Sequence, residues 1–248
     1  RVWDKDGRPT VWSESATWTL GLLEQTDWHG KWITGATNGP PLLDEALPLF
    51  RREFNLAKPV RRALVHVCGL GFYELRLNGQ KVGDHELDPG WTNYRKRCLY
   101  TSYDVTEHLR PGANALGLLL GNGMYNVRGG RYVKFTGSFG PPKLILQLHL
   151  EFADDSTQEI VSDASWKTAP GPITFSCIFG GEDYDARNEQ SGWDQPSFDD
   201  SNWRPVSVVE GPGGKLTAQS APPVQVMRTF PTVTITEPKA GVYVHDLG

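Results

Sequence analysis

The chain has 248 residues, which is near the upper end for one domain, so one large domain or two modest ones are expected. Its formal net charge of −4 argues against a general nucleic-acid-binding protein, which needs a basic surface to neutralise phosphates. No apolar run approaches the roughly 20 residues that span a bilayer, so neither nucleic acid nor a membrane is expected as a partner.

The first 24 residues have the pattern of a terminal hairpin. Trp12, Trp18 and Leu20 share a parity that suits the inward face of a strand. The chain opens abruptly on "RVWDKDG" and closes as abruptly on "GVYVHDLG", so we expect a fragment of a longer protein. Residues 1–24 are therefore predicted to be the end of a small β-sandwich whose earlier strands are missing.

A main domain is predicted over residues 28–214, built from short strands separated by glycine and proline. The segment "KLILQLHLEF" alternates most clearly, which predicts one buried and one solvent-exposed face. Its buried positions would be Leu144, Leu146, Leu148, Leu150 and Phe152, and its exposed positions Gln147, His149 and Glu151. The same alternation predicts inward faces at Ala63, Val65 and Val67, and at Leu116, Leu118 and Leu120.

Two turns are predicted between these strands. Asn78-Gly79 in "YELRLNGQKV" is the strongest hairpin signal, because both residues tolerate the positive φ of a type I′ turn. The stretch "LDPGW" predicts a type II turn, with Pro89 second and Gly90 third. Further on, "GPGGKLTAQSAPP" has the composition of a linker, and residues 222–248 are predicted to begin another β-domain. The fold class is all-β.

The segment "GGEDYDAR" holds the acidic residues that lie closest to aromatic residues and an arginine. An inverting glycosidase needs two carboxyl groups about 6.5–9.5 Å apart, and Glu182 with Asp185 could form such a pair. Alternatively, Asp185 forms an internal ion pair with Arg187, or these side chains contact a ligand. The three cysteines have no metal-ligand spacing, so no metal ligands are assigned.

Two loops combine aromatic rings with planar polar groups, the chemistry that binds sugars. The first loop contributes Trp91, Asn93 and Tyr94. The second contributes Asn122, Tyr125, Asn126 and Tyr132. Packing inside a sandwich is the competing interpretation for each aromatic ring in these loops.

Residues 68–126, from "CGLGFYELRLNGQKVGDHELDPGWTNY" to "GNGMYN", resemble the N-terminal accessory region of bacterial α-L-rhamnosidases, which are inverting glycoside hydrolases. The resemblance continues through "GGEDYDARNEQSGWDQPSFDDSNWRPV", and residues 1–24 resemble the end of a fibronectin-III-like module. It implies a jelly-roll, galactose-binding-like β-sandwich, which in some members binds L-rhamnose with Ca²⁺. It also implies a periplasmic or extracellular location.

In that family catalysis resides in a separate (α/α)6 barrel, and nothing in this sequence resembles the barrel's acidic motif. The resemblance therefore implies a non-catalytic fragment with no required cofactor, whose partners are a rhamnoside ligand and the catalytic domain of the same longer chain. Calcium enters by resemblance only, and the acidic turns "ADDS" and "FDDSN" do not assign its ligands. The alternatives are a structural spacer that packs on the catalytic barrel, and an autonomous enzyme that uses Glu182 and Asp185.

Overall fold

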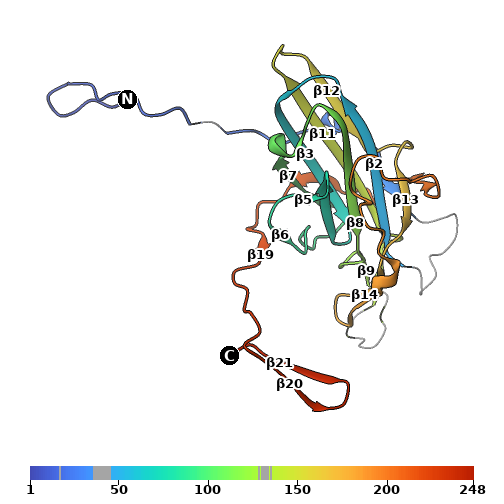
Figure 1. Cartoon of the computed structure of the whole chain (residues 1–248). Coiled ribbons are helices and arrows are strands. Elements are labelled where there is room, and N and C mark those ends of the chain that lie inside the picture. The colour runs from blue at the N-terminus through green and yellow to red at the C-terminus, as the bar shows by residue number, and fades with distance from the viewer. Residues whose placement is uncertain (17, 36–45, 128, 130–133, 135) are drawn as a thin grey trace.

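The computed structural model describes residues 1–16, 18–35, 46–127, 129, 134 and 136–248. Two large sheets pack face to face as a jelly-roll β-sandwich (Figure 1), and the prediction of an all-β fold is confirmed. In the described part of the chain, no helix is long and apolar enough to cross a membrane.

The first sheet has seven strands, all but one pair antiparallel. Its order is β17 (Ser207–Val208), β1 (Ile33–Thr34), β11 (Lys143–Phe152), β3 (Val60–Leu70), β7 (Arg97–Asp104) and β18 (Lys215–Ala218), with β12 (Thr157–Val161) also on β11. Strand β18 runs parallel to β7 and pairs with its first half only, residues 97–100. The second half of β7 is therefore a sheet edge.

The second sheet has six strands, all antiparallel. Their order is β16 (Arg204–Pro205), β13 (Lys167–Pro170), β2 (Pro48–Leu56), β8 (Gly112–Leu120), β4 (Tyr73–Leu77) and β5 (Gln80–Lys81). The turn between β4 and β5 confirms the Asn78-Gly79 prediction, since the φ angles of these residues are 53° and 85°.

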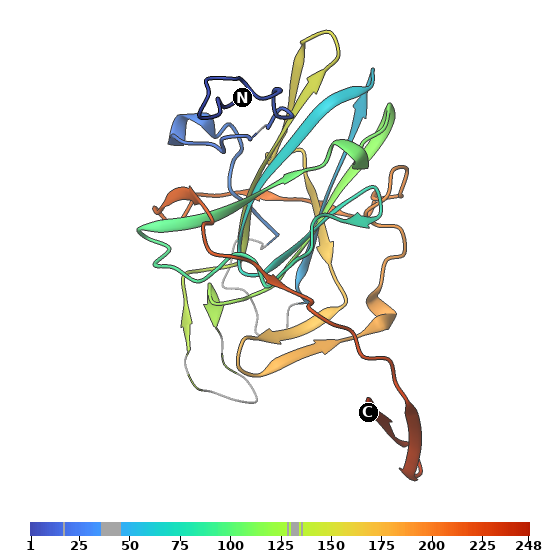
Figure 2. The same ribbon diagram turned by 90° about the vertical axis from the view of Figure 1, so that its left-hand side faces the viewer.

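Four two-stranded sheets and three short 3₁₀ turns lie outside the two large sheets in the described part of the chain. The pairs are β9 (Asn126–Val127) with β10 (Gly137–Ser138), β14 (Ile173–Cys177) with β15 (Gly181–Tyr184), β19 (Val224–Gln225) with β6 (His85–Glu86), and β20 (Thr234–Lys239) with β21 (Val242–Asp246). The 3₁₀ turns are η1 (Gln25–Asp27), η2 (Thr106–His108) and η3 (Ala186–Asn188). Hairpin β14–β15 and pair β9–β10 lie at the same end of the sandwich (Figures 1 and 2).

The main core lies between the facing sheets, as the alternation predicts. All five apolar positions of β11 are buried, and so are the predicted positions of β3 and β8. Trp166, the largest fully buried side chain, completes this core and donates its ring N–H to the Val161 carbonyl. The hydrophobic effect that stabilises the sandwich acts chiefly on this inner layer.

The opposite face of β11 differs from its prediction, because the preceding chain covers it. Gln147 was expected to face solvent but is fully buried. Its Oε1 accepts hydrogen bonds from the amides of His29 (2.6 Å) and Gly30 (3.2 Å), and its Nε2 donates to the Asp27 carbonyl (2.9 Å). A buried side-chain amide is tolerated here because both of its ends have backbone partners.

Two other local expectations need correction. The bond between Asp88 and Pro89 is cis, and Gly90 does not have the positive φ that a type II turn requires, so this turn is not formed. Trp12, Trp18 and Leu20 are 73%, 83% and 70% exposed, and residues 1–16 extend away from the sandwich (Figure 1). The fibronectin-III-like character of residues 1–24 stays a prediction.

Candidate functional site

The first predicted sugar loop is split between surface and core. Trp91 is 65% exposed and Asn93 is also exposed, but Tyr94 is buried. Asn93 shapes the loop, since its carbonyl accepts hydrogen bonds from the amides of Lys96 (2.8 Å) and Arg97 (2.9 Å). Trp91 and Asn93 are therefore open to a ligand, whereas the placement of Tyr94 favours packing.

The second predicted loop lies against the first. The Tyr125 ring is fully buried, 5.1 Å from the Tyr94 ring, and Phe139 contacts both rings. Two loops that are about thirty residues apart in the sequence thus share one aromatic cluster. Tyr132 lies outside the described residues.

The two asparagines of the second loop are buried and bonded to their neighbours. Asn126 donates from Nδ2 to Asn122 Oδ1 (2.8 Å) and accepts from the Ser138 hydroxyl (2.7 Å). Asn122 donates in turn to the Ser176 carbonyl on β14 (2.9 Å). These bonds tie the loop to hairpin β14–β15 and favour a structural role for both asparagines.

The acidic segment carries an ion pair at the surface. Arg187 donates from Nε to Asp185 Oδ1 (2.8 Å) and from Nη2 to Asp185 Oδ2 (2.6 Å), which is the ion-pair alternative of the sequence analysis. These bonds lower the pKa of Asp185 to about 2. A general acid needs a raised pKa, so this environment suits a loop-pinning ion pair better than proton donation. Glu182 is exposed on β15.

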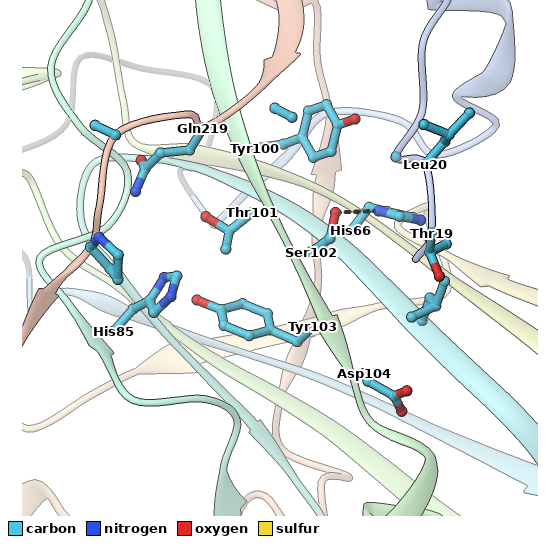
Figure 3. A pocket seen from close by; sticks show the side chains of 15 residues that line it. Thr19, Leu20, His66, His85, Tyr100, Thr101, Ser102, Tyr103, Asp104 and Gln219 are labelled. Atoms are coloured by element: carbon cyan, nitrogen blue, oxygen red, sulfur yellow. Dashed lines mark hydrogen bonds between the residues drawn. The ribbon is translucent and has the colours of Figure 1, made fainter. Parts of the chain in front are cut away.

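A groove that the sequence did not predict surrounds the free half of β7, and we call it the β7 groove (Figure 3). Its volume is about 460 Å³. The walls come from five segments: Thr19–Gly21, β3, β6, β7 and residues 218–223. Side chains of β7 alternate across it, so that Tyr100, Ser102 and Asp104 point to one side and Thr101 and Tyr103 to the other.

One side of the β7 groove carries hydroxyl, imidazole and carboxylate groups. Ser102 and Asp104 are exposed, and Ser102 Oγ lies 2.7 Å from His66 Nδ1. Burial, followed by the neighbouring His149, lowers the pKa of His66 to about 4, so its imidazole is neutral near pH 7. Neutral imidazole can donate from one ring nitrogen and accept at the other, as a site for hydroxyl groups requires.

The other side of the groove is organised by the buried carboxylate of Asp88. Its Oδ2 lies 2.6 Å from His85 Nδ1 and accepts hydrogen bonds from the hydroxyls of Thr101 (3.1 Å) and Tyr103 (3.3 Å). Its Oδ1 accepts from Gln219 Nε2 (3.0 Å). One carboxylate thus links the loop after β6, strand β7 and the segment after β18.

Sequence reasoning missed the groove because its walls meet only in the folded chain. The available signal was the parity of β3 and β7, which places His66 opposite Ser102 and Leu64 opposite Asp104 on the outer face of the sheet. A serine and an aspartate at alternate positions of one strand are also the ordinary pattern of a solvent-exposed strand face, so this signal does not by itself indicate a binding site.

The described residues show no cluster of acidic side chains to which a calcium ion can be assigned. Within these residues, no group of three or more His, Cys, Asp or Glu side chains gathers to hold a metal. The acidic turns are instead paired with cations: Asp155 with Arg61 (2.6 Å), and Asp200 with Arg51 (2.7 Å) and Lys167 (2.6 Å). Calcium binding stays a prediction from resemblance.

The family described as "Alpha-L-rhamnosidase N-terminal domain" matches residues 58–228, more than half of the chain. The chain belongs to this family. An α-L-rhamnosidase of Formosa agariphila is 36% identical over all of this chain, which covers 28% of that protein. The α-L-rhamnosidase N-terminal domain described here therefore spans less than a third of the length of this curated relative.

Solved structures agree with this assignment. An α-L-rhamnosidase from Dictyoglumus thermophilum matches with a TM-score of 0.82 and 41% identity, over 99% of this chain and 28% of that one. A Streptomyces avermitilis α-L-rhamnosidase, solved in complex with L-rhamnose, matches with a TM-score of 0.74 and 41% identity, over 82% of this chain and 20% of that one.

Proposed function

We propose that this domain is the non-catalytic N-terminal part of an α-L-rhamnosidase-like hydrolase, and that it binds L-rhamnose or a rhamnose-containing glycan in the β7 groove. The observation that carries the proposal is one groove lined by Ser102 and Asp104 on one side of β7 and, on the other, by His85, Gln219 and the half-buried ring of Tyr103. Its other partner would be the catalytic domain of the same longer chain.

The chemistry of the groove suits a sugar. Hydroxyl, carboxylate, imidazole and amide groups exchange hydrogen bonds with sugar hydroxyls, and an aromatic ring packs against the C–H face of a pyranose. The volume of about 460 Å³ lies within the range of small-molecule sites. The rhamnose complex of the Streptomyces relative supports this sugar class.

Binding in an open groove is expected to be weak, because few contacts are fully desolvated. A weak module is still useful when it is tethered, since it raises the effective concentration of glycan near the catalytic domain.

The test is a titration of the ¹⁵N-labelled chain with L-rhamnose up to about 50 mM, which covers weak sites. Shifts are expected at Ser102, Asp104 and Gln219. Ser102→Trp, which places a large ring in the groove, abolishes them, whereas Ser201→Trp at an exposed serine on another loop does not. Repeating the titration with calcium chloride measures any role of that ion. Absence of shifts in the unmodified chain overturns the proposal.

A second candidate function, the structural spacer, has one observation in its favour. Residues 224–247 carry exposed apolar side chains: Val224, Val226, Met227, Phe230, Val233, Ile235, Val242, Tyr243, Val244 and Leu247. Apolar surface of this extent usually marks an interaction site. Under this function, an environment-sensitive hydrophobic dye binds the 248-residue chain, and a longer chain that includes the catalytic domain loses this signal. Equal dye binding by both chains excludes the spacer role for residues 224–247.

A further inference from the structure

We propose that a second surface, at the start of β7, binds an anionic polysaccharide that carries uronate or sulfate groups. This surface consists of Trp91, Arg95, Lys96, Arg97 and Lys215, and we call it the Trp91 surface. It goes beyond the rhamnose proposal, because it involves other side chains and another ligand chemistry.

The first observation is a group of exposed cations without acidic partners. Arg95, Lys96, Arg97 and Lys215 are exposed, and within the described residues none of them forms an ion pair. Most other cations of the sandwich are paired, as Arg51, Arg61 and Arg76 are. A chain with a net charge of −4 thus carries a local group of four exposed cations without acidic partners.

The backbone brings these cations together. Arg97 on β7 and Lys215 on β18 are register partners in the parallel pair. The Lys215 amide also donates to the Lys96 carbonyl (3.1 Å). Cations from two segments more than a hundred residues apart in the sequence therefore lie side by side. A charged stretch that only faces solvent would not need a cation from a second, distant segment.

The second, independent observation is the exposed indole of Trp91, four residues before Arg95 in the same loop. Trp91 is 65% exposed, whereas Trp166 and Trp203 of the same sandwich are 0% and 7% exposed. The exposed face of an indole packs against the C–H face of a sugar, and the cations can pair with its acidic substituents. Together they favour a ligand that is both a sugar and an anion.

The loop that presents Trp91 is held in place before any ligand arrives. The Gly90 amide donates to Gln219 Oε1 (2.9 Å), and the Thr92 hydroxyl donates to the Arg97 carbonyl (2.5 Å). Leu87, just upstream, is 56% exposed and has a φ of 56°, a conformation that bulky residues rarely adopt. A loop fixed in this way loses little conformational entropy on binding.

The net negative charge of this chain favours an anionic polysaccharide over nucleic acid as the ligand of the Trp91 surface. Nucleic acid carries a dense line of phosphates, which the acidic remainder of this chain would repel. A polysaccharide with spaced carboxylates or sulfates places fewer charges near that remainder.

The test uses the 248-residue chain with polygalacturonate, dextran sulfate and neutral dextran as probes, monitored by Trp fluorescence and affinity electrophoresis at low salt. We expect binding to at least one polyanion, weakening with salt, and none to dextran. Preference for polygalacturonate or dextran sulfate distinguishes uronate from sulfate. Lack of binding to both polyanions overturns the proposal.

Variants assign the binding to this surface. The double variant Arg95→Gln/Lys96→Gln and the single variant Trp91→Ala are each expected to weaken binding about fivefold. Arg110→Gln/Lys239→Gln, which removes the same charge from exposed positions elsewhere, serves as the matched control, and thermal unfolding verifies that all variants fold. Equal weakening by the control pair would refute the assignment. Ser102→Trp separates the two proposals, because it blocks the β7 groove and leaves polyanion binding intact.

Discussion

His66 shows how burial sets the charge of a residue in the β7 groove. The side chain is 3% exposed and packs edge-on against Tyr100 and His149, with ring centroids 5.9 Å and 5.5 Å away. Protonation would place a cation in this poorly solvated position, next to a second imidazole. The pKa of His66 is therefore lowered to about 4, with desolvation the larger cause.

This lowered pKa predicts a loss of stability in mild acid. The unfolded chain protonates His66 near pH 6.5 and the folded chain near pH 4, so the unfolded state binds more protons in this window. The stabilising contribution is complete above pH 6.5 and falls as the pH decreases toward 4, by at most about 3 kcal/mol. Urea unfolding at pH 7.5 and pH 4.5 measures the change.

The control is His66→Gln, which cannot titrate in this range. The fall in unfolding free energy between the two pH values should be smaller in this variant than in the unmodified chain. A fall of equal size would show that other groups account for the acid sensitivity.

Asp88 makes a different prediction, because its carboxylate only accepts hydrogen bonds. In Asp88→Asn an NH₂ group would face at least one donor among Thr101, Tyr103 and Gln219, which leaves buried polar groups unpaired. We expect a loss of about 2 kcal/mol in the free energy of unfolding. Asp6→Asn in the exposed N-terminal segment is the matched control and should change it little. Equal unfolding midpoints for the two variants would contradict the role of Asp88.

The buried and exposed positions of a strand were predictable where only one of its faces is covered, by the other sheet. They were not predictable where another segment also covers the second face. Strand β11 alternates because its inner face packs on the second sheet, and its five apolar residues follow that rule. Gln147 breaks the rule because a distant segment, residues 27–30, covers it. Periodicity reports how one strand faces the core, but it contains no information on which loop folds back over the other face.

The turn between β4 and β5 is expected to be sensitive to substitution of its glycine. Gly79 has a φ of 85°, and a Cβ there would lie 3.1 Å from the Gln195 side chain. Gly79→Ala should therefore cost about 1–2 kcal/mol, from backbone strain and the close contact. Gly7→Ala, at a φ of 74° in the terminal segment and with open space around it, tests strain outside the sandwich. Urea midpoints should fall only for Gly79→Ala, and an unchanged midpoint would contradict this reasoning.

At the scale of the whole molecule, the candidate sites were predictable only where they depend on local sequence and not on contacts between distant segments. The sequence picked out Trp91 and Asn93, which are exposed, by residue chemistry alone. It also picked out Tyr94, Tyr125 and Asn126, which have the same chemistry but are buried. Residue type does not specify burial in a loop, because burial there depends on contacts between distant segments. The β7 groove has walls from five segments and was unpredictable for the same reason.

The C-terminal hairpin of β20 and β21 is expected to be much less stable than the sandwich. All residues of β20 and β21 are exposed, and the hairpin lies apart from the sandwich (Figure 1). A two-stranded hairpin without a packed face is marginally stable in water, so its amides should exchange with solvent within the shortest measurable times. Amides of the central strand β11, which pairs with β3 and β12, should exchange most slowly. Hydrogen exchange followed by mass spectrometry compares the two regions.

Limited proteolysis provides a second measurement of the same property. Cleavage after Arg228, which is exposed and precedes the hairpin, should remove β20 and β21 while the thermal midpoint of the sandwich stays within about 1 °C. This follows because the hairpin shares no core with the two large sheets, whose buried clusters contain no residue beyond Leu216. Slow exchange in β20 and β21, or a large fall in the midpoint after cleavage, would show that the hairpin packs on the sandwich. The exposed apolar residues at positions 233–247 would then no longer be available to a catalytic domain.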